Sequence, residues 1–185
     1  GNDTLIGGTG ADRLEGGAGR DTVDYSNETG KVIVSLISGT GLMKAAGDKL
    51  DSIENFVGTN YNDVASGTHG SNVLKGGGGN DILHGYGGND LLYGGAGDDV
   101  LNGGAGKDAF IFVDGHDVIE DFDVHDDSLK VSKSVLPSGV NTAGKFMDLA
   151  VVSGGNTIFD LGGGNIIEIE GVINQNLLEQ SVYLF

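Results

Sequence analysis

The sequence predicts an all-β, right-handed β-solenoid that ends in an antiparallel β cap. A nine-residue unit, best written Gly-Gly-x-Gly-x-Asp-x-Leu-x, recurs from Gly58 to Glu120 and, more briefly, at the N-terminus. Each unit joins a glycine-rich turn of six residues, in which positive φ angles are expected, to a strand of three. Two units make one flattened coil of eighteen residues, and coils must stack because a single unit cannot bury its Leu.

The first array covers residues 1–24 and consists of a half unit followed by GGTGADRLE and GGAGRDTVD. The eighth position of each unit is apolar and is expected to point into the coil. A disordered linker is excluded, because disorder does not require an apolar residue at a fixed spacing. The expected core column of both arrays is Leu5, Leu14, Val23, Ala65, Leu74, Leu83, Leu92, Leu101, Phe110 and Ile119.

Residues 25–57 interrupt the repeat and are expected to form an irregular coil that continues the stack. Two apolar runs, Val32–Leu36 and Ile53–Val57, predict strands, and Gly39–Gly47 between them is expected to be a loop. Asp48 and Asp51 have two interpretations: they belong to a solvated loop, or they supply one further metal ligand.

The second array, residues 58–120, contains seven copies of the unit. Its seventh position is expected to point outward and is apolar, which gives one apolar rank on each face of the coil. Partial cover of one rank by the cap, by residues 25–57 or by a further domain is expected; simple strand propensity is the alternative. The ranks contain Val64, Val73, Ile82, Leu91, Val100, Ala109 and Val118.

Residues 121–185 are expected to form the terminal cap, because a solenoid must cover its open hydrophobic end. Gly154–Asn156 and Gly162–Gly164 predict turns between antiparallel strands, and Asn174–Gln180 predicts one helical turn. The predicted strands are Ser128–Ser132, Leu149–Val152, Thr157–Leu161, Ile166–Glu170 and Val182–Phe185.

The sixth position carries the candidate metal ligands, because alternate turns bring their side chains to the same edge of the stack. Stacked carboxylates repel one another unless a cation lies between them, and oxygen ligands with flexible geometry suit Ca²⁺ better than Mg²⁺. The absence of Cys and of an ordered His pair argues against Zn²⁺. One edge is expected to carry Asp63, Asp81, Asp99 and Asp117, the other Asn72, Asp90 and Asp108; Asp3 and Asp21 share an edge that Asp12 does not.

Composition limits the classes of function. The 185 residues carry a formal net charge of −17, and ten scattered Lys and Arg exclude nucleic acid as a direct partner. Self-repulsion disfavours a compact state, so folding and the binding of roughly five to eight Ca²⁺ ions are expected to be one event. No apolar run is long enough to span a membrane. Because Gly1 lies in mid-repeat, the chain is expected to be the C-terminal part of a larger protein.

The units that begin at Gly7, Gly16, Gly76, Gly85, Gly94 and Gly103 resemble the repeats-in-toxin (RTX), or haemolysin-type, calcium-binding family. The resemblance implies a parallel β-roll in which sixth-position carboxylates and glycine-turn carbonyls hold Ca²⁺ between successive coils. The copies that contain Tyr61, Asn72 and Asp117 depart from the pattern, so the weakest sites are expected around Asn72 and Asp117 and the strongest from Asp81 to Asp108. The glycines implicated in this way are Gly8, Gly10, Gly17, Gly19, Gly77, Gly79, Gly88, Gly95, Gly97, Gly104 and Gly106.

The resemblance also implies a route of secretion and a class of function. Val182–Phe185 is similar to an uncleaved C-terminal export signal, which implies a bacterial protein secreted by a type I apparatus together with an upstream cargo domain. The leading hypothesis is a module that folds on Ca²⁺ outside the cell; the alternative is Ca²⁺-dependent binding of a polysaccharide or a surface, as in alginate-epimerase tails or adhesins. An enzyme is not expected, because neither His-Glu-x-x-His nor Gly-x-Ser-x-Gly occurs.

Overall fold

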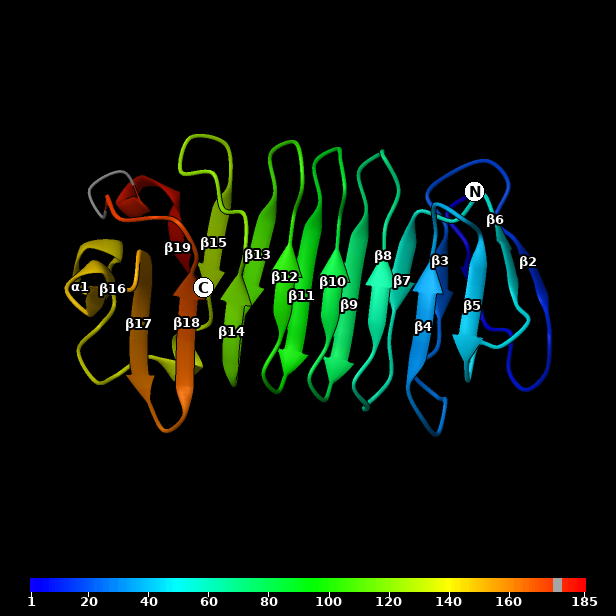
Figure 1. Cartoon of the computed structure of the whole chain (residues 1–185), viewed down its shortest axis with the longest axis horizontal. Coiled ribbons are helices and arrows are strands. Elements are labelled where there is room, and N and C mark those ends of the chain that lie inside the picture. The colour runs from blue at the N-terminus through cyan, green and yellow to red at the C-terminus, as the bar shows by residue number, and fades with distance from the viewer. Residues whose placement is uncertain (175–177) are drawn as a thin grey trace.

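The computed structural model describes residues 1–174 and 178–185, and it shows an elongated stack of coils with one sheet on each broad face (Figure 1). The first sheet contains, in spatial order, β1 (Thr4–Leu5), β3 (Thr22–Asp24), β7 (Asn55–Val57), β9 (Val73–Gly78), β11 (Leu91–Ala96), β13 (Ala109–Phe112), β15 (Ser128–Val131) and β19 (Val182–Leu184). The second contains β2 (Arg13–Glu15), β6 (Lys49–Asp51), β5 (Thr40–Met43), β4 (Val32–Ser35), β8 (Val64–Ser66), β10 (Ile82–His84), β12 (Val100–Asn102), β14 (His116–Ile119), β18 (Asn165–Ile169), β17 (Asn156–Gly162) and β16 (Ala150–Ser153).

The coils pair in parallel at the period that the sequence predicts. Leu83 lies opposite Leu101 in one sheet, and Leu92 lies opposite Phe110 in the other, so equivalent positions are eighteen residues apart. The eighth-position side chains fill the space between the sheets. All are buried except Leu5 in the first coil, which is partly buried against the same core. Each fully buried Leu contributes about 1.5–3 kcal/mol, so the column holds the two sheets together.

Residues 25–57 continue the stack with β6 in the second sheet and β7 in the first, and they insert two extra strands, β4 and β5, into the second sheet only. In the first sheet β3, β7 and β9 are direct neighbours, whereas in the second sheet β4 and β5 lie between β6 and β8. The prediction of a loop over Gly39–Gly47 is wrong, because β5 lies within it and pairs antiparallel with β4. Gly41 is buried in this strand, where a side chain would overlap Ala45, so the glycine serves close packing rather than a turn.

The outward seventh-position side chains are partly exposed, and only Ile82, at 39%, counts among the exposed large apolar residues. In Figure 1 no segment crosses in front of β8, β10 and β12. On this face the strands are therefore not covered by the cap or by residues 25–57, and cover of the rank on the other face stays a prediction. Equivalent seventh-position residues lie opposite one another on adjacent strands, as Val64, Ile82 and Val100 do.

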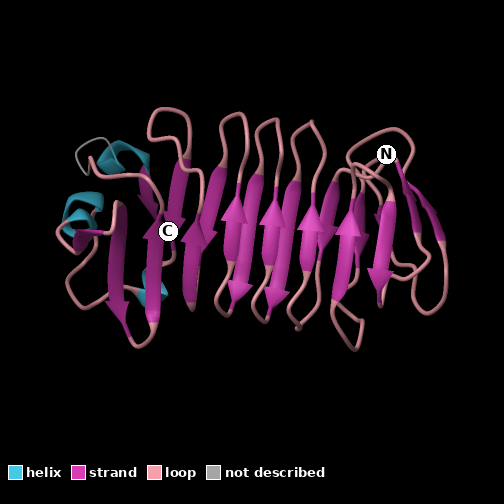
Figure 2. Ribbon diagram, viewed as in Figure 1, coloured by secondary structure: helices cyan, strands magenta, loops and turns pink. Residues whose placement is uncertain are grey.

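The C-terminal segment closes the stack in a mixed manner. The predicted antiparallel hairpins form between β16, β17 and β18, but β18 pairs in parallel with β14, and β15 and β19 extend the first sheet in parallel. The sequence did not predict the short helices η1 (Lys133–Val135) and α1 (Ala143–Met147); Figure 2 shows the helices gathered at this end. Phe146 of α1 stacks on Phe159 with ring centroids 4.4 Å apart, which seals the core.

The predicted helical turn at Asn174–Gln180 falls partly on residues 175–177, which lie outside the described residues; after them, Glu179–Ser181 forms the 3-10 turn η2. Within residues 1–174 and 178–185, no helix has the length and apolar character needed to cross a membrane.

Candidate metal sites

The sixth-position side chains form a hydrogen-bonded rank along each edge of the stack. On one edge the backbone N–H of Asp63 donates to Asp81 Oδ1 (2.6 Å), and that of Asp81 donates to Asp99 Oδ1 (2.8 Å). On the other edge the N–H of Asn72 donates to Asp90 Oδ1 (2.7 Å), and that of Asp90 to Asp108 Oδ1 (2.8 Å). One oxygen of each carboxylate thus fixes the register between coils.

The second carboxylate oxygen is buried and has no protein partner. Within residues 1–174 and 178–185, no donor reaches Oδ2 of seven sixth-position residues. Leaving a buried charged oxygen without a partner is costly, so each such group requires an explanation. The seven are Asp12, Asp21, Asp81, Asp90, Asp99, Asp108 and Asp117.

Main-chain oxygens converge on the same places. A methyl group on Gly76 would overlap Asp81 Oδ2 and would lie 2.6 Å from the carbonyl oxygen of Gly94, in the next coil on that edge. The same relation holds for Gly85, where the carbonyl oxygen of Gly103 would lie 2.5 Å away. The first-position glycines therefore leave room beside a carboxylate and a carbonyl. They were not among the residues implicated from the sequence, which emphasised the second and fourth positions.

The second- and fourth-position glycines shape the turns. All eleven that the sequence implicates have φ between 79° and 142°, a region that disfavours side chains, and Tyr86 takes the same backbone conformation at φ 76°. Several also let one turn approach the next: a methyl group on Gly95 would overlap the carbonyl oxygen of Gly77. The glycines are required by backbone geometry at every coil.

Burial raises the pKa of five of these carboxyl groups, because desolvation penalises the charged form; the five are Asp81, Asp90, Asp99, Asp108 and Asp117. The pKa of Asp81 rises to about 8 and that of Asp117 to about 9, in both cases first through desolvation and further through the neighbouring Asp99 carboxylate. The pKa values of Asp90 and Asp99 rise to about 6, again chiefly through desolvation. In the protein alone, the fold therefore opposes the ionisation of its own carboxylates at neutral pH.

These residues fit a hard divalent cation held by oxygen. Across the described residues, no three His, Cys, Asp or Glu side chains converge on one point, so a side-chain cage is not available. A carboxylate oxygen next to a turn carbonyl is instead the mixed oxygen environment that Ca²⁺ accepts.

Comparison with known proteins agrees with this geometry. Residues 1–27, 57–92 and 84–119 match the family model described as the RTX calcium-binding nonapeptide repeat. The chain carries RTX repeats. RTX repeats bind Ca²⁺ and act as a structural module, so this chain contains a Ca²⁺-binding β-roll.

The solved structures show the same fold. The extracellular lipase LipA from Serratia marcescens is similar over 100% of this chain, with a TM-score of 0.58 and 19% sequence identity. The RTX chain spans only 38% of the length of that lipase, so the likeness concerns the β-roll architecture. No curated protein matches the chain.

In two RTX copies, both of which begin Gly-Thr, protein groups satisfy the hydrogen-bonding capacity of the sixth-position side chain. Asp63 Oδ2 accepts from the backbone N–H of Thr59 (2.6 Å), and its Oδ1 accepts from that of Val32 (2.7 Å). Asn72 Oδ1 accepts from the N–H of Thr68 (2.8 Å), and its amide donates to the carbonyl of Glu54 (2.6 Å). These two positions lack the unpartnered oxygen that marks the seven.

The two remaining predicted ligands, Asp3 and Asp117, also differ in whether they have a buried, unpartnered oxygen. Asp3 is exposed at the first coil, and its N–H donates to Asp21 Oδ1 (2.7 Å). Asp117, in the copy that lacks the leading glycine pair, nevertheless has the same buried, unpartnered Oδ2 as the strict copies. The distance of a copy from the RTX consensus therefore does not decide the environment of its carboxylate.

Three acidic residues outside the strict repeat extend the ranks. Asp48 is buried: it accepts from the N–H of Asp12 (2.9 Å) and from the hydroxyl of Tyr25 (2.8 Å), so the solvated-loop interpretation is wrong for Asp48, whereas Asp51 is exposed. Asp127 accepts from the N–H of Asp108 (2.8 Å), and Glu54 accepts from that of Asp21 (2.8 Å). The fixed spacing of the RTX unit did not reveal Glu54 and Asp127, because neither lies eighteen residues from its partner.

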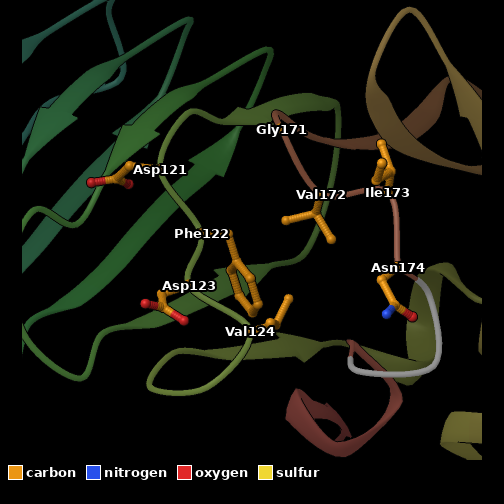
Figure 3. Close-up of a pocket in the computed structure, with 8 residues that line it drawn as sticks. All are labelled: Asp121, Phe122, Asp123, Val124, Gly171, Val172, Ile173 and Asn174. Carbon is orange, nitrogen blue, oxygen red and sulfur yellow. The ribbon is translucent and has the colours of Figure 1, made fainter.

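A separate hollow of about 410 Å³ lies where the last coil meets the C-terminal segment (Figure 3). Phe122, Val124 and Val172 face one another there, while the carboxylates of Asp121 and Asp123 point away from Val172. Asp121 uses both oxygens to accept from the N–H groups of Gly103 (2.9 Å) and Gly104 (2.6 Å). The acidic residues beside this hollow thus have structural partners and do not form a second candidate site.

Proposed function

We propose that this chain is a calcium-dependent folding module that supports the secretion and stability of a larger extracellular protein. One observation carries the proposal: seven buried Asp Oδ2 atoms have no partner in the described residues, and first-position glycines leave room beside six of them. In each site, the Asp carboxylate and nearby turn carbonyls would hold the ion. Bound Ca²⁺ supplies positive charge that offsets the desolvation and mutual repulsion of the carboxylates.

The mechanism couples folding to metal binding. Without the ion, every coil added to the stack buries another carboxylate in a chain that already carries a formal net charge of −17. With the ion, the same carboxylates bridge neighbouring coils, and metal-binding free energy becomes folding free energy. The chain is therefore unfolded where Ca²⁺ is scarce, and it folds at the Ca²⁺ concentrations at which extracellular modules bind.

We infer that this switch serves export. An unfolded chain can pass a type I secretion channel, and folding outside the cell prevents its return. The apolar C-terminal end, Val182–Phe185, is the segment we propose the apparatus reads in the chain before it folds.

Two experiments test the proposal. Isothermal titration with Ca²⁺ is expected to show several bound ions in the chain and fewer in the double variant Asp90→Asn/Asp108→Asn; a wild-type chain that binds no Ca²⁺ would refute it. For export, the chain is fused behind a reporter in a bacterium with a type I apparatus, with and without its last four residues. Equal secretion of the two fusions would contradict the assigned role of the C-terminus.

A further inference from the structure

The short turn between β6 and β7 occupies the place of a complete nonapeptide turn. In the first array, residues 16–21 connect β2 to β3, whereas only Ser52–Glu54 connects β6 to β7, the neighbouring strands in the same two sheets. The N–H of Gly16 donates to the carbonyl of Asp51 (3.0 Å), which aligns Ser52 with the first position of the repeat. This turn lies outside the residues that match the RTX model.

Glu54 takes the role of the sixth-position Asp. The N–H of Asp21 donates to Glu54 Oε2 at 2.8 Å. Farther along the same edge, the N–H of Asp90 donates to Asp108 Oδ1 at the same distance. The turn is three residues shorter than a nonapeptide turn, and the additional methylene of Glu extends the carboxylate to reach its neighbour. The carboxylate rank thus continues through a segment without the repeat.

Ser52 takes the role of the first-position glycine in the next coil. It has φ 56°, in the left-handed region that residues with side chains rarely adopt. Its carbonyl oxygen is directed at Gly16, where a methyl group would overlap it and would lie 2.7 Å from Asp21 Oδ2. Gly94 has the corresponding relation to Gly76 and Asp81 in the second array.

Asp21 shows that a ligand is required at this place. Its side chain is 0% exposed, and within the described residues its Oδ2 has no hydrogen-bond partner. The guanidinium of Arg20 extends past the short turn and donates to the carbonyl of Ser71 (2.6 Å), so it does not neutralise Asp21.

We propose that the carboxylates of Asp21 and Glu54 and the carbonyl oxygen of Ser52 form a Ca²⁺ site. Asp21 comes from a nonapeptide turn, whereas Ser52 and Glu54 come from the short turn outside the repeat. The proposal rests on the proposed calcium function and extends it to a segment outside the repeat. Its chemistry is that of a hard divalent cation, with two carboxylates and at least one main-chain oxygen. The site would connect the two arrays, because the backbone carbonyl of Glu54 also accepts a hydrogen bond from the side-chain amide of Asn72 in the second array (2.6 Å).

The test counts Ca²⁺ ions in the complete chain by native mass spectrometry. Glu54→Gln keeps an acceptor for the Asp21 N–H but removes the charge, so it is expected to bind one ion fewer than the wild type. Glu120→Gln is the matched control: Glu120 is exposed and accepts from the amide of Asn102 (3.3 Å), and the variant is expected to bind the wild-type number.

Glu54→Asp provides a second variant, because it keeps the charge but is one methylene too short to reach Asp21; it is also expected to lose the ion. Far-UV circular dichroism in saturating Ca²⁺ checks that the variants are folded. The wild-type number of ions in either folded Glu54 variant would overturn this site alone. A wild-type chain without bound Ca²⁺ would overturn the proposed function as well.

Discussion

The substitution Asp81→Asn separates the two effects of a buried carboxylate, its cost in the metal-free fold and its contribution in the metal-bound fold. Asp81 is 1% exposed, and its pKa is raised to about 8, first by desolvation. At pH 7.5 a rise from 3.8 to about 8 corresponds to about 5 kcal/mol, and solvent screening at the open edge reduces this to roughly 2–4 kcal/mol. An amide avoids that cost, and Asn72 shows how: its amide donates to a carbonyl of the preceding coil.

We therefore expect opposite effects in the two states. In excess chelator at pH 7.5, where the wild type is expected to lack β structure, Asp81→Asn is expected to raise the free energy of unfolding by roughly 2–4 kcal/mol, seen as a larger folded fraction. In Ca²⁺ it loses a charged ligand, so the midpoint of calcium-induced folding is expected to rise at least about tenfold, or 1.4 kcal/mol.

The assay in chelator is the folded fraction by far-UV circular dichroism at pH 7.5, and the assay in Ca²⁺ is the midpoint of the calcium titration followed in the same way. Asp148→Asn is the control, because Asp148 is exposed in the C-terminal segment and the charge change is the same. If Asp81→Asn had no larger folded fraction in chelator than Asp148→Asn, or the same calcium midpoint, the reasoning about unpartnered carboxylates would be wrong.

Three further predictions follow from the same geometry. Because folding raises carboxyl pKa values from 3.8 to about 6 for Asp99 and about 8 for Asp81, the metal-free fold binds more protons than the unfolded chain; its stability is greatest below about pH 4 and falls as pH rises towards about 8. Circular dichroism in chelator should therefore show β structure increasing from pH 8 to pH 5, and a decrease would contradict the assignment. Asp63→Asn is expected to leave the ion count by native mass spectrometry unchanged but to lower stability in urea by about 1–2 kcal/mol, because an amide N–H would face a backbone donor. Leu92→Ala removes a fully buried side chain and is expected to cost about 2–5 kcal/mol in saturating Ca²⁺, whereas Leu42→Ala, at a residue 58% exposed, should leave the urea midpoint nearly unchanged.

The periodic part of the fold was predictable because each position of the unit has one physical task. Leu83 and Leu101 are core residues by position alone, and they pair as the spacing requires. Asp81 and Asp99 were placed on a common edge by the same argument, and the bond between them follows that spacing.

The structure differs from the sequence prediction where tertiary contacts, rather than the nine-residue repeat, determine the environment of a residue. The strand β5 contains Gly41, which the sequence marks as a loop residue but which packs closely against Ala45. Asp48 is buried because Tyr25, distant in sequence, donates to it. The unequal roles of Asp63 and Asp81 depend on the backbone N–H of Thr59, which stands where the copy of Asp81 has Gly77 with φ 113°. Thr at the second position was the available signal, and the sequence-based prediction did not use it.

The most direct test follows folding and calcium binding together in one titration at pH 7.5, with circular dichroism for the fold and a calcium-selective electrode for the bound ion. The buried Asp carboxylates predict that the two curves coincide and that β structure is absent in chelator. A chain that is fully folded in chelator at this pH, and that then binds Ca²⁺ without any change in structure, would contradict the account.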